Sequence, residues 1–155
     1  MEGYTTRIKV RGYHTDFYGH VNNTRYLEFY EEDRWYWLEK TIDLTELMKK
    51  GLAFAVVNIN VSYRRPVFVG STIEIRSRLD KVGSHSATLR QEIFLAGTDK
   101  LVSDALVTFV ITGKEGKALN MNADVPELRE LIAMMKAMSA SGDKRPEAAY
   151  PASVN

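Results

Sequence analysis

The residues best suited to chemistry gather in one short stretch of the chain, residues 16–23. It contains an acid, a glycine, a histidine and two asparagines: Asp16, Gly19, His20, Asn22 and Asn23. A carboxylate can act as a base or a nucleophile on a carbonyl carbon, and a glycine lets backbone approach a substrate closely. The pattern therefore favours an active loop for acyl transfer to water. The same residue types also favour turns and caps, so a plain turn role for Asp16 is an equal alternative at this point.

A long helix is predicted directly after this loop, from Asn22 or Asn23 to about residue 40. Either asparagine can cap it, and capping is the primary role we expect for both. The start of a helix also presents unpaired backbone N–H groups and the positive end of its dipole, which together can hold an oxyanion. The helix start is thus the element that would position the chemistry of the loop.

The apolar side of this helix is unusually wide. At about 100° per residue it covers an arc of roughly 200°, whereas a helix on a flat surface needs about half of that. We therefore expect a sheet that curls around the helix. Asp33 and Arg34 interrupt the arc, and Trp35 lies in the stripe of glutamates on the other side. The apolar arc consists of Tyr26, Leu27, Phe29, Tyr30, Tyr36, Trp37 and Leu38.

Alternating or continuous apolar runs predict five strands, with glycine-containing turns between most of them. The run at residues 54–63 is almost wholly apolar, so we expect a central strand buried on both faces, with Asn58 and Asn60 inside it. Short helices are expected at residues 43–50 and 125–138. This order indicates an α+β fold: one antiparallel sheet with a helix against it. The strands are predicted at residues 5–11, 54–63, 72–79, 86–95 and 101–112.

The composition narrows the possible functions. A length of 155 residues suits one domain, predicted at residues 1–138 with a tail at 139–155. The net charge of +1 gives no general attraction to nucleic acid. The chain lacks cysteine and has three histidines, so we expect no metal site. With no apolar run long enough for a membrane span and no signal pattern, we expect a cytoplasmic protein.

The loop also resembles a known family. The run Asp-x-x-Gly-His-Val-Asn-Asn at residues 16–23, with Glu-Glu-Asp-Arg-Trp at residues 31–35, closely resembles hotdog-fold acyl-CoA thioesterases of the 4-hydroxybenzoyl-CoA thioesterase-like group. It is nearest to the bacterial long-chain acyl-CoA branch, and the likeness covers about residues 5–112. Tyr18 departs from the pattern, because plant acyl-carrier-protein thioesterases that share His-Val-Asn-Asn have asparagine there.

The resemblance implies a curled sheet around one central helix, and subunits paired edge to edge as a homodimer or homotetramer with sites at the interface. It implies that Asp16 is catalytic, that His20 and Asn23 support it, and that backbone N–H groups from Val21 to Asn23 polarise the carbonyl. The acyl chain would lie along the helix and CoA on the surface, with no metal or redox cofactor. Asp33 stands where close relatives tend to have a small residue; a pair with Arg25, Arg34 or a neighbouring subunit is one explanation.

Several other residues are candidates for substrate binding. Tyr26 and Asn58 are two of them, although a buried amide such as Asn58 more often joins a structural network or has a role across the dimer. Arg64 and Arg65 could meet CoA phosphates, although a solvated strand-end pair is the commoner role. We predict hydrolysis of medium- to long-chain acyl-CoA, with Asp16 as base or nucleophile. The alternatives are an acyl-binding module without catalysis, a hydratase, or a thioesterase for acyl-carrier-protein or aryl-CoA substrates.

Overall fold

The computed structural model describes the backbone at residues 5–140 and 147–148, and side chains up to residue 137. Most of the tail predicted at residues 139–155 lies outside these ranges. The third helix ends at residue 140, just beyond the predicted domain boundary. The elements are β1 (Thr5–Lys9), a 3-10 turn (Gly12–His14), α1 (Asn23–Thr41), α2 (Leu44–Lys49), β2 (Ala53–Tyr63), β3 (Thr72–Val82), β4 (Ala87–Leu95), β5 (Leu101–Thr112), α3 (Pro126–Ala140) and β6 (Glu147–Ala148).

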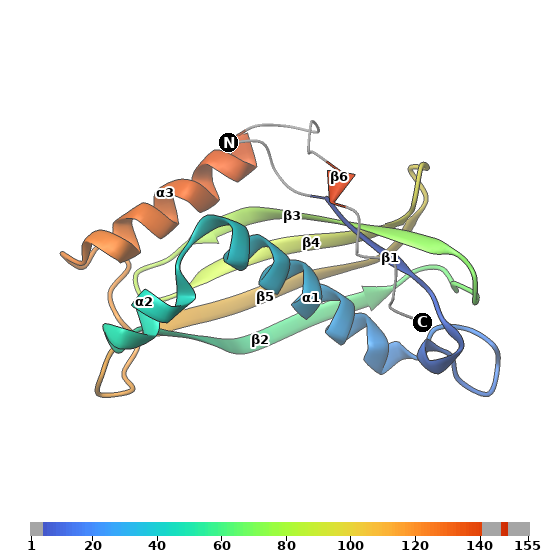
Figure 1. Ribbon diagram of the computed structural model, residues 1–155, viewed down its shortest axis with the longest axis horizontal. Helices are drawn as coiled ribbons and strands as arrows, with labels where there is room; N and C mark the ends of the chain where they lie inside the picture. The colour runs from blue at the N-terminus through green and yellow to red at the C-terminus, as the bar shows by residue number, and fades with distance from the viewer. Residues whose placement is uncertain (1–4, 141–146, 149–155) are drawn as a thin grey trace.

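The predicted curled antiparallel sheet around one long helix is confirmed. The strand order is β2-β5-β4-β3-β1-β6, and all neighbours are antiparallel except the two-residue β6, which pairs parallel with β1. Figure 1 shows α1 crossing one face of the sheet, with α2 and α3 near the far end of α1. The sheet therefore has one face on the helix layer and one face turned away from it.

The prediction that residues 54–63 form a central, doubly buried strand is wrong. This segment is β2, which lies at the edge of the sheet and pairs only with β5 among the described strands. Asn58 and Asn60 are exposed, as are Val56 at 45% and Val57 at 58%. A continuous apolar run is compatible with a buried strand, but here it marks an edge whose backbone and side chains are open to a further partner.

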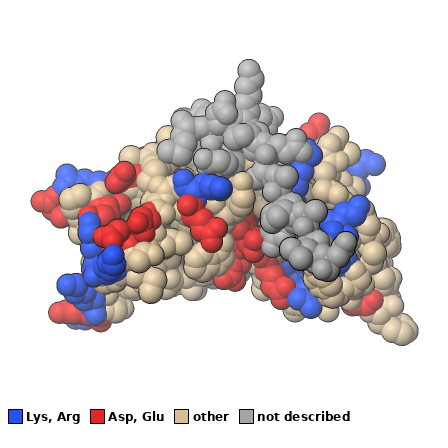
Figure 2. Space-filling model, viewed as in Figure 1, with Lys and Arg blue, Asp and Glu red and all other residues tan. Residues whose placement is uncertain are grey.

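The start of α1 follows the prediction closely. The side chain of Asn22 caps it, accepting a hydrogen bond from the Thr24 N–H at 3.2 Å. The apolar arc is buried at Tyr26, Tyr30 and Trp37, while glutamates occupy the opposite side and give the band of acidic side chains over the middle of Figure 2. The sheet and the smaller helices thus cover most of the wide arc predicted from the sequence, while Leu27 at its edge stays exposed.

The core consists of two apolar clusters along α1. The first packs around Tyr26, Phe29 and Tyr30 near the start of the helix, where Tyr30 is fully buried. The Tyr30 hydroxyl donates to Ser103 Oγ at 2.7 Å, so its polar end is satisfied. The second cluster packs around Trp37 and includes residues of α2 and α3. The two clusters share one helix but rest on different parts of the sheet.

A polar network lies at the boundary between these clusters and centres on Asp33, which is 3% exposed. Its carboxyl group accepts from Thr6 Oγ1 at 2.6 Å, from Gln91 Nε2 at 3.0 Å and from the Ser77 hydroxyl. Arg34 joins through Gln91, donating to its Oε1 at 2.8 Å. These hydrogen-bond partners of Asp33 are hydroxyls and an amide from β1, β3 and β4, and the carboxylate also acts on Arg34: burial lowers the pKa of that guanidinium, and the charge of Asp33 opposes this effect. One side chain of α1 is therefore tied to three strands.

Replacing Asp33 with alanine should lower the free energy of unfolding by about 3 kcal/mol, because buried donors on three strands lose their acceptor. Urea unfolding followed by circular dichroism measures the change. Glu39→Ala, an exposed acid on the same helix, is the matched control and should change stability by less than about 0.5 kcal/mol. Equal stabilities for the two variants would show that the network does not hold α1 to the sheet.

Candidate active site

The Asp16 loop is closed by its own hydrogen bonds. Asp16 Oδ1 accepts from the Tyr18 N–H at 2.9 Å, and the Asp16 carbonyl accepts from the Gly19 N–H at 3.0 Å. Gly19 has φ of 78°, a conformation that favours glycine. The Asp16 N–H donates back to the His20 carbonyl at 2.9 Å. These bonds orient one carboxylate oxygen and leave Oδ2 without a protein partner within the described part of the chain.

The loop is anchored on both sides by neighbouring strands and turns. Val21 N–H donates to the Val67 carbonyl at 2.8 Å, and Asn22 N–H donates to the His14 carbonyl at 2.9 Å. His14 is buried, its ring lies edge-on to Phe29 with centroids 5.0 Å apart, and its Nδ1 accepts from the Arg11 N–H at 2.9 Å. Sequence reasoning missed this role of His14, although its place two residues before Asp16 could have suggested it.

The start of α1 offers one open backbone donor. Of the three N–H groups expected to polarise a carbonyl, those of Val21 and Asn22 are already bonded to protein carbonyls. The Asn23 N–H has no protein acceptor among the residues that the structure describes. On its other side, the Asn23 carbonyl accepts from the Tyr63 hydroxyl at 3.0 Å. Tyr63, which the sequence did not single out, thereby fixes one end of β2 to the helix start.

Exposed apolar side chains surround the loop. Phe17 is 97% exposed, and Tyr18 and Phe68 are also exposed. The half-buried ring of His20 lies between Tyr18, at 6.2 Å, and Phe68, at 5.3 Å between centroids. In Figure 2 the corner that projects at the lower right, where this loop lies in Figure 1, is tan rather than charged. His20 is therefore held among aromatic rings, beside an uncharged surface that suits an apolar substrate or a partner subunit.

Tyr26 lies close to the helix start, as predicted. It is buried against Tyr63 and Phe29, and burial raises its pKa to about 12, so the hydroxyl stays protonated at neutral pH.

Asn58 does not lie with the loop. It pairs with Thr108, whose side chain contacts Thr88 on the sheet face that is turned away from α1. Along β2, Asn58 is also about 17 Å from Tyr63 at the rise of an extended strand.

The two arginines at the end of β2 differ in their partners. The Arg64 side chain forms an ion pair with Asp104, and this hydrogen bond raises the pKa of Arg64 above its ordinary value. Arg65 is exposed and its side chain has no partner among the described residues. Of the two, Arg65 is the one more available to a phosphate group.

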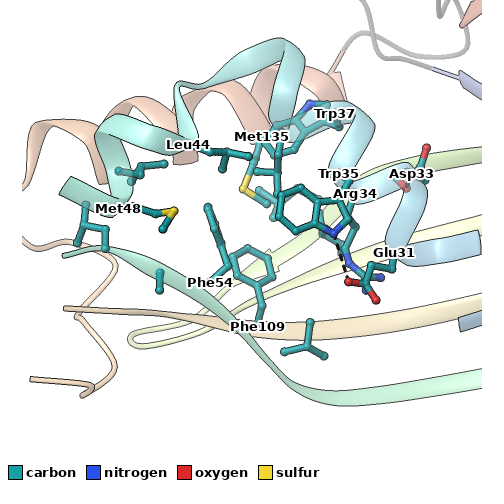
Figure 3. A pocket seen from close by; sticks show the side chains of 18 residues that line it. Glu31, Asp33, Arg34, Trp35, Trp37, Leu44, Met48, Phe54, Phe109 and Met135 are labelled. Carbon is teal, nitrogen blue, oxygen red and sulfur yellow. Dashed lines mark hydrogen bonds between the residues drawn. The ribbon is translucent and has the colours of Figure 1, made fainter. Parts of the chain in front are cut away.

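A cavity of about 340 Å³ lies at the opposite end of α1, between that helix, α2, α3 and the sheet. Its lining is mostly apolar and includes Trp35, Leu44, Met48, Phe54 and Phe109. Figure 3 shows the Trp35 indole on the α1 side and the rings of Phe54 and Phe109 on the sheet side. This volume lies in the range of small-molecule sites. The local sequence patterns do not predict a cavity at this end of α1.

Comparison with known proteins decides the family. The profile of the thioesterase-like superfamily matches residues 10–138, which contain the Asp16 loop, α1 and the cavity. The chain belongs to the thioesterase-like superfamily. This confirms the resemblance noted in the sequence and makes the protein an enzyme of the hydrolase class.

Two relatives from Escherichia coli support the assignment. The thioesterase is 47% identical to the long-chain acyl-CoA thioesterase FadM of strain K12 over 131 residues, which are 84% of this chain and 97% of FadM. The crystal structure of YbaW, a probable thioesterase, matches with a TM-score of 0.78 and 45% identity over 85% of this chain and 98% of YbaW. A hypothetical protein, TT1821 of Thermus thermophilus, matches with a TM-score of 0.72 and 26% identity over 84% and 98% of the two chains.

The residues that the structure describes contain neither a membrane-spanning helix nor a cluster of metal ligands. Within the described residues, no helix is long and apolar enough to cross a membrane. In the same residues, His, Asp and Glu side chains do not gather in threes as a metal site would require.

The buried His14 predicts a pH dependence of stability. Burial, with a smaller contribution from Arg25, holds the pKa of His14 below its ordinary value of 6.5. Protonation therefore favours the unfolded chain, and the free energy of unfolding should fall as the pH is lowered through about 6.5. Urea unfolding at about pH 7.5 and 5.5 measures this fall, which should be smaller in His14→Asn. His85→Asn, which removes an exposed histidine, is the control; a fall reduced equally in both variants would contradict the account.

Proposed function

We propose that this thioesterase hydrolyses acyl-CoA thioesters to the free acid and CoA, with a preference for long acyl chains. The observation that carries the proposal is that one loop and the helix start after it hold both an open carboxylate oxygen, on Asp16, and an open backbone N–H, on Asn23. The first can activate water or attack, and the second can stabilise an oxyanion. The likeness to FadM supports the choice of acyl-CoA and of long chains.

Two routes use the same groups. In the first, Asp16 takes a proton from water as the water oxygen attacks the thioester carbon. The Asn23 N–H then stabilises the oxyanion, and collapse expels CoA thiolate, which recovers the proton. In the second, an Asp16 oxygen attacks directly, CoA thiolate leaves, and water hydrolyses the resulting anhydride. Both routes need only this chain and water, so no cofactor forms part of the proposal.

The geometry around the loop supports distinct roles for its neighbours. Gly19 and the Tyr18 N–H hold Asp16 in its turn, and Asn22 caps the helix whose first N–H faces the reaction. His20 and its aromatic neighbours would border the thioester, and Arg65 would meet a phosphate of CoA at the end of β2. The acidic side of α1 would repel those phosphates, which favours the basic end of β2 for CoA. A cytoplasmic location, predicted from the sequence, belongs to the proposal.

We also propose that two copies pair along β2. This strand has 11 residues, lies at the edge of the sheet and exposes Val56, Val57 and Tyr63. An edge strand of this length with apolar side chains is a template for further pairing. A twofold axis perpendicular to the sheet would join the two edges antiparallel and keep both helix layers on the same side.

Asp16→Asn should lower kcat at least about 100-fold for palmitoyl-CoA, because the amide can neither take a proton nor attack. Thiol release measured with a chromogenic reagent gives the rate. Asp99→Asn makes the same chemical change in the exposed turn between β4 and β5 and should keep the rate. Near-normal turnover of the Asp16 variant would contradict the proposed role, and acyl-CoA binding without thiol release by the unmodified protein would favour the non-catalytic module. Label in the Asp16 carboxylate after a single turnover in water enriched in oxygen-18 would identify direct attack followed by hydrolysis at the Asp16 carbonyl, because the general-base route leaves this carboxylate unlabelled.

Val57→Lys should shift the protein toward monomers, because a charged edge side chain opposes strand pairing. Sedimentation velocity over a range of protein concentrations measures the shift. Asp99→Lys, which adds a lysine to the exposed turn between β4 and β5, should keep the association state of the unmodified protein. An unchanged association state in Val57→Lys would exclude pairing along β2.

A further inference from the structure

Exposed aromatic rings form a continuous row at one corner of the molecule. The rings of Phe17 and Tyr18 lie edge to face with centroids 5.7 Å apart, and the next ring along the row is His20, 6.2 Å from Tyr18. Phe68 lies on the other side of His20 at 5.3 Å. Phe17 is 97% exposed and Tyr18 is 76% exposed. The exposed apolar side chains of this corner form one surface, the aromatic tip: Phe17, Tyr18, Phe68 and Val69.

Backbone hydrogen bonds hold the aromatic tip in its exposed position. His20 and Phe68 form an antiparallel bridge between the two segments that carry the tip. The Ser71 N–H donates to the Phe68 carbonyl at 3.2 Å, and the Val21 N–H donates to the Val67 carbonyl at 2.8 Å. Figure 1 shows the loop before α1 extending past the start of that helix, at the lower right. The rings are therefore presented on an ordered loop, so little chain entropy is lost when they bind a partner.

Basic side chains lie close to the aromatic tip. Lys9, Arg11 and Arg65 are exposed. The Gly70 N–H donates to the Val10 carbonyl at 2.9 Å, so the turn that ends the tip lies beside the segment from Lys9 to Arg11. Arg65 is only three residues before the first tip residue of that turn. Cations therefore flank the apolar rings on both segments.

The two segments that carry the tip are basic overall. Residues 9–21 and 64–71 contain four Lys or Arg residues and one acid, Asp16. One of the four, Arg64, pairs with Asp104; the other three are the exposed side chains beside the tip. Apolar rings bordered by Lys and Arg are typical of proteins that bind anionic membrane surfaces. The rings enter the boundary between headgroups and hydrocarbon, while the cations meet lipid phosphates.

The proposed substrate gives a physical reason for such a surface. Long-chain acyl-CoA joins a hydrocarbon chain to a charged head, and each methylene buried in a bilayer favours the membrane by about fourfold. A long-chain thioester therefore resides mainly in lipid, whereas hexanoyl-CoA stays in solution. Asp16 is adjacent to Phe17 in the chain. Contact of the tip with a bilayer thus brings the Asp16 carboxylate to the headgroup layer, where the thioester lies between its chain and CoA.

We propose that the aromatic tip binds an anionic membrane surface and that the enzyme takes long-chain acyl-CoA directly from the bilayer. The uptake of substrate rests on the proposed function, whereas the binding of lipid rests on the tip and its basic border alone. A bilayer suits this surface better than a partner subunit does, because a projecting corner can enter a fluid layer without a complementary hollow.

Vesicle flotation without acyl-CoA tests the tip directly. The unmodified protein should float with vesicles of phosphatidylcholine and phosphatidylglycerol in equal parts. Phe17→Ser should lower this partition at least about tenfold, because it removes the most exposed ring. Met48→Ser, which removes a 75% exposed apolar side chain on α2, is the matched control and should keep the partition of the unmodified protein. Failure of the unmodified protein to float, or equal flotation of the two variants, would overturn the proposal.

The chain has no cysteine, which allows site-specific labelling. A nitrobenzoxadiazole label on Phe17→Cys should gain fluorescence when vesicles are added, because its surroundings lose water, and the same label on Met48→Cys should not. A label at position 17 that stays in water would contradict insertion. If Phe17→Ser lost the association state of the unmodified protein in sedimentation velocity and kept its flotation, the tip would be a protein interface, which also overturns the proposal.

Thiol release separates this inference from the proposed function. With palmitoyl-CoA carried in the vesicles, Phe17→Ser should lower the rate relative to that with hexanoyl-CoA in solution at least about tenfold, since the variant partitions less to the lipid. An unchanged ratio of the two rates would overturn direct uptake from the bilayer. Flotation with thiol release from neither substrate would contradict the proposed function, whereas thiol release without flotation would overturn the membrane surface alone.

Discussion

The arrangement of this protein depends on the hydrogen bonds that the buried carboxyl group of Asp33 accepts from the sheet. This group lies inside the apolar arc of α1, where an acid is costly unless its oxygens are bonded. Thr6, Ser77 and Gln91 supply those bonds from three different strands, which fixes the rotation and the height of α1 over the sheet. The first residues of α1, and with them the loop that precedes it, inherit their position from this contact.

The same network divides the interior. On one side, aromatic residues of α1 fill the space beneath the Asp16 loop, which gives the loop a rigid base. On the other side, the core includes a cavity with an apolar lining. The polar network lies between these two parts, so the fold keeps the packed base of the Asp16 loop separate from the cavity.

Much of this could be predicted from local patterns. The wide apolar arc at residues 26–38 predicts the curled sheet, and residue types alone locate the asparagine cap and the Asp16 loop. The failures are long-range. The apolar run of β2 does not distinguish a buried central strand from an edge strand, because both need apolar side chains, and the difference lies in what pairs with it. Likewise, the bond of the Tyr63 hydroxyl to the Asn23 carbonyl joins residues 40 positions apart, which no local spacing records.

In the Asp16 loop, local spacing predicts the residues at the site but not which of their atoms stay available. The sequence placed backbone donors at residues 21–23, and the structure leaves only the Asn23 N–H open because Val67 and His14 accept from the other two. Tyr18 appeared as a departure from a family pattern, yet its backbone N–H is the group that bonds Asp16, while its ring lies against His20. Motifs identify which residues approach a substrate, while the hydrogen-bond partners decide which atoms remain available.

The most direct test of the account is a crystal structure of the protein with palmitoyl-carba(dethia)-CoA, in which a methylene group replaces the thioester sulfur and prevents hydrolysis. The account predicts the carbonyl oxygen at hydrogen-bond distance from the Asn23 N–H and the carbonyl carbon beside Asp16 Oδ2. A carbonyl held elsewhere, away from Asp16 and the start of α1, would contradict it.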